Sequence, residues 1–185
     1  MTVVISLKNK YDQQVVPAMK EQFGYTNSLA VSNLTKVVIN TGLGQRGKED
    51  NLLKTIINDF TKITGQKPII TKAKKSISGF KIREGMTLGL KTTLRRKKMY
   101  DFVDRLINII LPRTRDFRGL SPKMVDRSGN LTIGLKEQIV FPEIKPEQVT
   151  TKFGLEITLV NTAKNYSEGL ALFQQLGLPF KKIIE

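Results

Sequence analysis

Positively charged side chains are the most concentrated functional groups in this 185-residue sequence. Twelve Lys and Arg residues and a single acid, Glu84, lie between Lys62 and Lys98, which gives this segment +11 of the total net charge of +15. A run of a few charged residues usually forms a solvated face of a protein. An excess of eleven positive charges is different, because the side chains repel one another unless a nearby anion neutralises them. The segment therefore predicts a polyanionic partner, and nucleic acid is the commonest one.

The groups used by most enzyme mechanisms are missing. The sequence has no His and no Cys, which excludes Ser-His-Asp and Cys-His nucleophiles, imidazole or thiolate metal sites, and disulfides. Carboxylate pairs occur at Asp101 with Asp104 and at Glu143 with Glu147. The first pair has ordinary helical spacing beside basic residues, which explains it without catalysis. We therefore expect a protein that is not an enzyme and has no cofactor or metal.

A glycine pattern provides the rival interpretation, a cytosolic nucleotide-binding enzyme. Gly42, Gly44 and Gly47 have the G-x-G-x-x-G spacing of dinucleotide-binding loops, between a predicted strand and a predicted helix. In that fingerprint an acidic residue about twenty positions further on binds the ribose. The next predicted strand here ends in Thr71 and Lys72 instead. The pattern therefore favours a structural turn, or a loop that contacts nucleic-acid phosphate.

Hydrophobic periodicity predicts the elements that position these groups. Spacings of three and four predict helices at 4–23, bent by Pro17, at 48–64, at 99–111, ended by Pro112, and at 166–176. Alternating or β-branched runs predict strands at 34–40, 67–71, 86–94, 131–136 and 155–160. The segment 72–85 is too long for a tight turn and rich in Lys, Ser and Gly, so we expect a protruding basic loop.

The order of these elements predicts an α+β fold in a single domain, 1–185. No helix joins the strands on either side of the basic loop, so they should pair antiparallel. We expect a mainly antiparallel sheet with helices packed on one face and the other face free to bind RNA. The first residues lack a signal-peptide pattern, and the apolar run 106–111 is too short to span a bilayer. We therefore expect a soluble protein of a reducing compartment, without a membrane partner.

The strand 86–94 indicates what the free face offers. Its alternation places Thr87, Gly89, Lys91 and Thr93 on one face and mostly apolar side chains on the other. Small, polar and basic residues let RNA approach closely. Because this face lacks paired aromatics for stacking bases, folded or double-stranded RNA is favoured over a splayed single strand.

Three longer motifs resemble a known family. They are ITGQKPIITKAKKSISGFKIREG (63–85), LPRTRDFRGL (111–120) and EQIVFPEI (137–144). They resemble the bacterial form of large-subunit ribosomal protein five, the 5S-rRNA-binding family of the central protuberance. The similarity extends from about Lys8 to Lys182. The tail 183–185 extends beyond the usual end of the family, and we assign it no role.

The resemblance implies a structural, non-catalytic protein of the large ribosomal subunit that contacts 5S rRNA and large-subunit rRNA. The 5S contact positions of the family fall on Asn40, Gln66 and Thr93, and Lys91, Arg95 and Arg96 are the neighbouring basic candidates. A loop reaching peptidyl-site tRNA corresponds to Lys72, Lys74, Lys75, Ser76, Ser78, Gly79, Phe80, Lys81 and Arg83.

The resemblance also implies protein partners. The region 113–130 corresponds to the part that meets a small-subunit head protein across the intersubunit bridge, and other proteins of the central protuberance are expected neighbours. The implied location is the ribosome of a bacterial cytoplasm. A plastid-encoded copy stays open as an alternative, since it would also lack a transit peptide.

Overall fold

The computed structural model describes residues 6–44, 49–115 and 117–181. The strands are β1 (Leu34–Gly42), β2 (Ile69–Lys72), β3 (Thr87–Leu94), β4 (Leu131–Leu135) and β5 (Leu155–Asn161). The α-helices are α1 (Leu7–Lys10), α2 (Val16–Phe23), α3 (Asp50–Thr64), α4 (Arg96–Arg105), α5 (Leu111–Arg113) and α6 (Tyr166–Leu176). Short 3₁₀ turns lie at Ser28–Ala30, Ser78–Phe80, Pro122–Met124, Gln138–Val140 and Pro146–Gln148.

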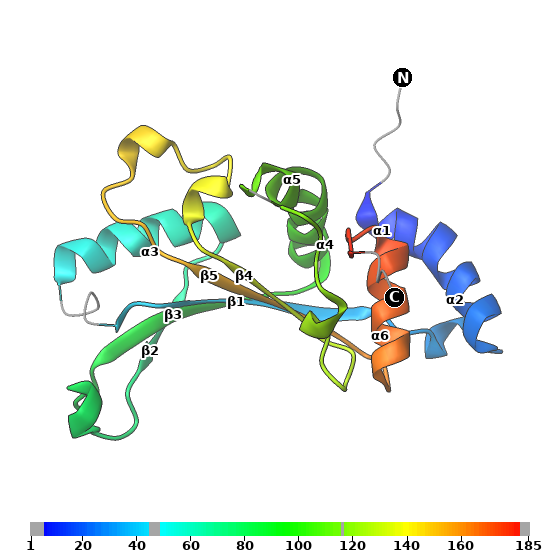
Figure 1. Cartoon of the computed structure of the whole chain (residues 1–185), viewed down its shortest axis with the longest axis horizontal. Helices are drawn as coiled ribbons and strands as arrows, with labels where there is room; N and C mark the ends of the chain where they lie inside the picture. The colour runs from blue at the N-terminus through cyan, green and yellow to red at the C-terminus, as the bar shows by residue number, and fades with distance from the viewer. Residues whose placement is uncertain (1–5, 45–48, 116, 182–185) are drawn as a thin grey trace. The chain divides into compact units, whose positions relative to one another are not determined.

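The strands form one antiparallel sheet in the order β2-β3-β1-β5-β4, with helices packed against it (Figure 1), which confirms the predicted α+β class. One face of the sheet is buried because apolar residues alternate along the strands. Its fully or nearly buried members include Val37, Ile39, Leu90, Leu94, Leu131, Ile133, Ile157 and Leu159. On the other face the intervening residues of β1, β4 and β5 are at least partly exposed.

The chain divides into two compact units, which we describe separately. The helical unit comprises Met1–Val37, Leu94–Ile133 and Thr158–Glu185, and the loop-bearing unit comprises Val38–Thr93 and Gly134–Ile157. Helix α3, strand β2 and the basic loop belong to the loop-bearing unit, whereas α1, α2, α4, α5 and α6 belong to the helical unit.

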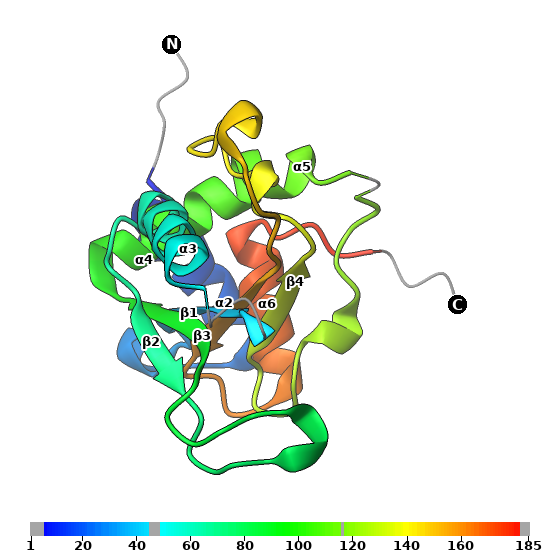
Figure 2. The same ribbon diagram turned by 90° about the vertical axis from the view of Figure 1, so that its left-hand side faces the viewer.

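In the loop-bearing unit α3 covers one side of the strands. Its side chains Ile56, Phe60 and Ile63 are fully buried, and the helix ends at Gly65, which adopts the left-handed conformation (φ 63°). Figures 1 and 2 show α3 on one side of β2 and β3 and the loop between these strands extending toward the other side. The loop is therefore accessible from the side that α3 leaves open.

In the helical unit, two prolines lie inside longer helical segments. Pro17 and Pro112 each follow a π-helical turn, Tyr11–Val15 and Leu106–Ile110 respectively. The prediction that Pro112 ends its helix is off by one residue, since α5 continues to Arg113. A proline lacks an N–H and crowds the preceding turn, and the wider π turn takes up that misfit within a continuous helix.

Within 6–44, 49–115 and 117–181 there is no helix long and apolar enough to cross a membrane. In the same part of the chain no group of three or more Asp and Glu residues is arranged to hold a metal ion.

Candidate nucleic-acid interface

The open side of β3 presents the polar residues that its alternation predicts. Leu90, Thr92 and Leu94 are buried, whereas Lys91 is exposed and Thr93 is partly exposed. Strand β2 pairs with β3 so that Ile69 lies opposite Lys91 and Thr71 lies opposite Gly89. Ile69, 73% exposed, therefore shares the open side with Lys91.

Gly89 allows the neighbouring strand to approach closely. A Cβ atom at this position would lie 2.5 Å from the carbonyl oxygen of Thr41 and 3.1 Å from Oγ1 of Thr71, so nothing larger than glycine fits. Gly89 itself is buried, so it lets the strands on either side of β3 pack closely and does not offer a contact surface of its own.

Asn40 joins this surface from β1. The Leu43 N–H donates to the Leu88 carbonyl at 2.8 Å, and the antiparallel register continued from this pair places Asn40 across from Lys91. Asn40 is partly exposed and lines a shallow surface hollow of about 310 Å³ together with Glu156 of β5. The structure therefore brings Asn40, Lys91 and Thr93 to one side of the loop-bearing unit.

Gln66 lies in the turn between α3 and β2, where its backbone rather than its side chain holds the turn. The Thr64 hydroxyl donates to the Gln66 carbonyl at 2.8 Å and accepts from the Gln66 N–H at 3.4 Å. The Gln66 residue is exposed. Continuing the β2–β3 register by two residues places Lys67 opposite Thr93, so Gln66 lies at the same end of β3 as Thr93.

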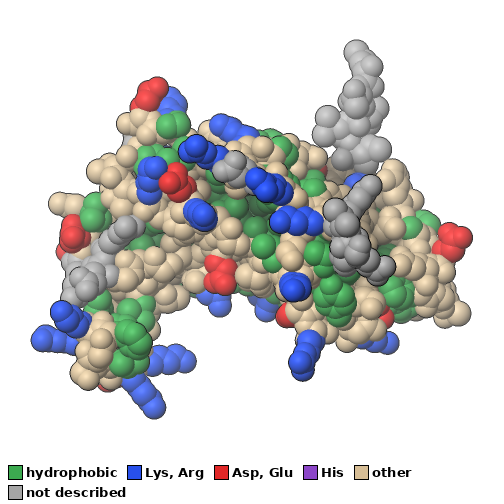
Figure 3. All heavy atoms as spheres, in the orientation of Figure 1, with side chains coloured by type: hydrophobic (Ala, Val, Ile, Leu, Met, Phe, Trp, Pro, Cys, Tyr) green, Lys and Arg blue, Asp and Glu red, His purple; other side chains and the backbone are tan. Residues whose placement is uncertain are grey.

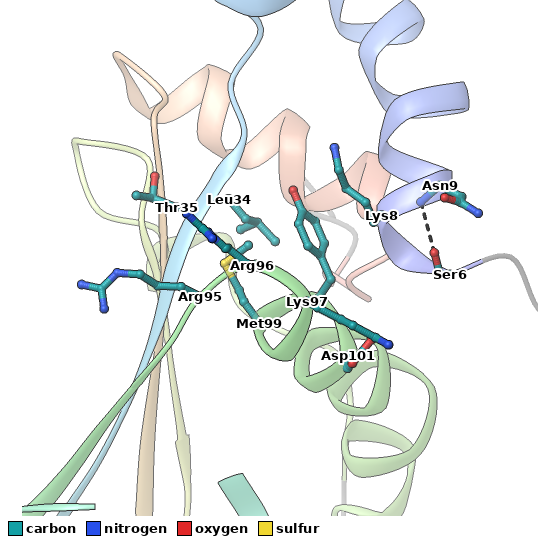
Figure 4. A pocket seen from close by; sticks show the side chains of 11 residues that line it. Ser6, Lys8, Asn9, Leu34, Thr35, Arg95, Arg96, Lys97, Met99 and Asp101 are labelled. Atoms are coloured by element: carbon teal, nitrogen blue, oxygen red, sulfur yellow. Dashed lines mark hydrogen bonds between the residues drawn. The ribbon is translucent and has the colours of Figure 1, made fainter. Parts of the chain in front are cut away.

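Arg95 and Arg96 fall in the helical unit, at the start of α4. They line a cavity of about 670 Å³ together with Lys8, Lys97 and other residues of the α1 and α4 regions (Figure 4). Arg96 has a positive φ of 52°, an uncommon backbone conformation for a residue with a side chain. The first turn of α4 contains no acidic residue, although a helix N-terminus favours negative charge. Four cations, Lys8, Arg95, Arg96 and Lys97, therefore line the cavity at the positive end of this helix, against one acid, Asp101.

Two tyrosines lie beside the Lys8 ammonium group. That group is 5.1 Å from the ring centroid of Tyr11 and 5.7 Å from that of Tyr100, and it forms a 2.6 Å ion pair with Asp12. Burial raises the pKa of Tyr100, although the nearby Lys8 charge opposes that rise. The Tyr100 hydroxyl, at the cavity wall, is therefore protonated at neutral pH and able to donate a hydrogen bond.

The basic loop between β2 and β3 is an ordered turn. Ile77 and Ile82 exchange two backbone hydrogen bonds of 2.9 and 3.1 Å, and the Ser76 hydroxyl accepts from the Glu84 N–H at 2.9 Å. All the predicted loop residues are exposed, namely Lys72, Lys74, Lys75, Ser76, Ser78, Gly79, Phe80, Lys81 and Arg83. Figure 3 shows Lys and Arg side chains projecting from this loop in several directions.

The alternative sites suggested by the sequence have ordinary structural surroundings. Gly44 has a positive φ of 55°, and a Cβ there would meet nothing within 4 Å; Gly47 lies outside the described residues. Asp104 accepts a 3.0 Å hydrogen bond from the side-chain amide of Asn108, one helical turn away. Asp101 is exposed at the edge of the cavity beside α4.

The sequence matches the family described as Ribosomal protein L5 over residues 27–83 and the C-terminal region of the same ribosomal family over residues 87–180. Together these two matches cover most of the chain. The chain belongs to the ribosomal L5 family.

Relatives from bacteria and from a plastid are named as members of the same ribosomal protein family. A protein of Desulfatibacillum aliphaticivorans, named large ribosomal subunit protein uL5, is 50% identical over 96% of this chain and 99% of its own length. The uL5 of Caldanaerobacter subterraneus subsp. tengcongensis is 51% identical, over 95% of this chain and 98% of its own. The uL5c of Porphyra purpurea is also 51% identical, over 97% and 99% respectively. Bacterial and plastid relatives are therefore about equally similar to this chain.

Family membership confirms the prediction of a ribosomal protein that is not an enzyme. Sequence reasoning missed two groups on these surfaces. Ile69 lies on the open side because it pairs directly with Lys91 across β2 and β3, and this register is not visible along the chain. The contribution of Lys8 and Tyr100 to the cavity beside Arg95 depends on contacts between distant segments, which no local pattern reveals.

Proposed function

We propose that this chain is a structural constituent of the large ribosomal subunit that binds 5S rRNA through the open side of β1 and β3. The observation that supports this best is the surface formed by the side chains of Asn40, Lys91 and Thr93, which lie on one side of the paired strands β1 and β3. It offers an amide, a hydroxyl and an ammonium group without an aromatic stacking pair. These groups match ribose hydroxyls and phosphates of a folded RNA.

Arg95 and Arg96 extend the proposed rRNA contact in the helical unit. Both are exposed, and the first turn of α4 also contains Lys97 and Lys98. One guanidinium group can donate two parallel hydrogen bonds to two oxygens of the same phosphate. The partial positive charge at the N-terminus of a helix also favours a bound phosphate. Large-subunit rRNA and 5S rRNA both present such phosphates. We assign these two arginines to the phosphate backbone rather than to base recognition.

The basic loop is the proposed contact with peptidyl-site tRNA. Its backbone hydrogen bonds hold the turn itself, and its cationic side chains point outward. This arrangement suits the backbone of a transient RNA better than a fixed base-reading contact. The region 113–130, which exposes Arg113, Arg118 and Lys123, is the proposed contact with a small-subunit head protein. Other central-protuberance proteins are the remaining proposed neighbours.

Alanine substitutions test the 5S rRNA surface. Asn40→Ala, Gln66→Ala and Thr93→Ala should each weaken 5S rRNA binding by about 1–2 kcal/mol, since each removes a hydrogen bond to RNA. Their midpoints of thermal unfolding should stay near that of the unsubstituted chain. Thr55→Ala is the matched control, because Thr55 is exposed on α3. Equal losses of stability and of binding would mean that the three residues are structural instead.

Replacing the loop tests the second contact. A Gly/Ser linker of equal length in place of residues 74–80 should leave 5S rRNA affinity within a few-fold and weaken retention of peptidyl-site tRNA. Filter binding measures the first quantity on the isolated chain. The second is measured on large subunits reconstituted with the altered chain and joined to small subunits. Loss of 5S binding with normal tRNA retention would reverse the two assignments.

A further inference from the structure

The tip of the basic loop carries an exposed apolar patch. Phe80 is 74% exposed and Ile77, three residues earlier, is 47% exposed. Ile77 is the extended residue that precedes the 3₁₀ turn Ser78–Phe80, and Phe80 is the last residue of that turn. Figure 3 shows apolar side chains at the loop with Lys and Arg around them. A phenylalanine this exposed contributes little to the core. An exposed apolar patch surrounded by charged residues is typical of a binding site for another molecule.

The backbone fixes how Phe80 is presented. The Lys81 N–H donates to the Ser78 carbonyl at 3.0 Å, and the paired Ile77 and Ile82 close the turn beneath it. Lys81 has a positive φ of 53°, a conformation that costs free energy in a residue with a side chain. Gly79 precedes Phe80, and a Cβ at that position would meet nothing within 4 Å. The aromatic ring therefore projects from a held turn with open space on its N-terminal side.

The surroundings of the ring identify the chemistry of the partner. Lys74, Lys75, Lys81 and Arg83 are exposed around it, and Glu84 is the only acid between Lys62 and Lys98. Adjoining the turn is a hollow of about 970 Å³ lined by Ser76, Ser78, Lys81 and Arg83, together with Ile82, Met86 and the acid Glu84. Two hydroxyl groups and two cations against one carboxylate leave this lining able to donate hydrogen bonds and net positive, as a phosphate site requires. An aromatic face next to phosphate-binding groups is the combination that binds a nucleotide, with the base stacked and its phosphate neutralised.

We propose that Phe80 stacks on an exposed nucleobase of the RNA that the loop contacts, so that the contact depends on an aromatic face as well as on charge. The inference rests on the proposed function, in which that RNA is peptidyl-site tRNA. Stacking tolerates any base because every base has a π face, so this contact suits a site that receives many different tRNAs.

Four single substitutions separate stacking from charge. Phe80→Ala removes the ring, Phe80→Leu keeps an apolar side chain without a π face, and Phe80→Trp keeps and enlarges that face. Lys75→Gln, also at an exposed loop position, removes one charge and serves as the matched control. Ribosomes reconstituted with each full-length chain are loaded with deacylated tRNA in the peptidyl site, and its dissociation constant is measured at several salt concentrations.

We expect Phe80→Ala and Phe80→Leu to weaken retention about tenfold, the lower part of the range for losing one stacked base, with an unchanged salt slope. Phe80→Trp should retain wild-type affinity. Lys75→Gln should instead make the slope of log K against log salt shallower by about 0.7–0.9. Because Phe80 is largely exposed, the midpoint of thermal unfolding should not move in any Phe80 variant.

A spectroscopic measurement gives an independent readout. The sequence contains no Trp, so Phe80→Trp introduces a single reporter at the proposed contact, and its emission should be quenched when the isolated chain binds tRNA. Wild-type retention in Phe80→Leu, or unquenched emission on a bound tRNA, would overturn stacking while leaving the tRNA assignment intact. If replacing the whole loop also leaves tRNA retention unchanged, the proposed tRNA contact and the stacking contact both fail.

Discussion

At the scale of single residues, Gly89 allows the strands beside β3 to pack closely. Replacement by alanine would bring a methyl group to 2.5 Å from the Thr41 carbonyl oxygen, which is backbone and has little room to move. We expect Gly89→Ala to lower the free energy of unfolding by about 1–3 kcal/mol, the usual cost of overpacking. Urea titration measures it. Gly134→Ala in β4 is the control, because a Cβ there meets nothing within 4 Å; equal effects in both variants would refute the steric argument.

Tyr11 makes stability depend on alkaline pH. Its hydroxyl donates to the Ser32 carbonyl at 3.1 Å, and burial raises the pKa of Tyr11 to about 12, with smaller contributions from Tyr100 and Asp12. Between its unfolded pKa of about 10 and its folded pKa, the unfolded chain loses this proton while the folded chain keeps it. The Tyr11 contribution is therefore complete below pH 10 and falls by about 2–3 kcal/mol by pH 12.

Tyr11→Phe tests this dependence. At pH 8 the variant should be about 1 kcal/mol less stable than wild type, because a buried hydrogen bond is lost. Its stability should then fall less steeply than that of wild type between pH 10 and 12. Urea titrations across this range compare the two, with Tyr166→Phe as a control at a more exposed tyrosine. Parallel curves for wild type and Tyr11→Phe would show that Tyr11 has no raised pKa.

At the scale of elements, side-chain caps define where helices begin. The Asn165 side chain accepts a 2.9 Å hydrogen bond from the Glu168 N–H at the start of α6, and Gly177 ends that helix in the left-handed conformation. Asn165→Ala should lower the free energy of unfolding by about 1 kcal/mol, whereas Asn165→Asp, which also caps, should cost less. Thermal unfolding measures both. Identical losses in the two variants would indicate that the cap contributes little.

At the scale of the whole molecule, the net charge of +15 should make the proposed binding of 5S rRNA depend on salt. If about six of the twelve cations between Lys62 and Lys98 contact phosphates, log K for 5S rRNA should fall with log salt at a slope of roughly −4 to −5. Titrations at several salt concentrations measure that slope. Lys91→Gln should make it shallower, whereas Lys20→Gln, outside the basic segment, should not. A wild-type slope shallower than about −2 would mean that the basic segment mostly faces solvent.

The sequence by itself determined the local features of this protein. Strands 131–136 and 155–160 and helix 166–176 were each predicted within one residue of β4, β5 and α6, because alternation, apolar spacing and Gly177 are local signals. The charge of the basic segment and the absence of His and Cys likewise need no structure. These features, with the three family motifs, sufficed to predict the α+β class and a ribosomal protein that is not an enzyme.

Only the tertiary structure decided which distant segments meet. The strand order β2-β3-β1-β5-β4 places Asn40 beside Lys91 and gives Gly89 its steric role, and neither follows from spacing along the chain. Gly129 has the local pattern of a turn, but its backbone also packs so closely on α6 that a Cβ at Gly169 would lie 2.3 Å from its carbonyl oxygen. Such contacts form only when whole elements pack together. The free energy of that packing is shared cooperatively among distant segments, so it cannot be predicted from any short stretch of sequence.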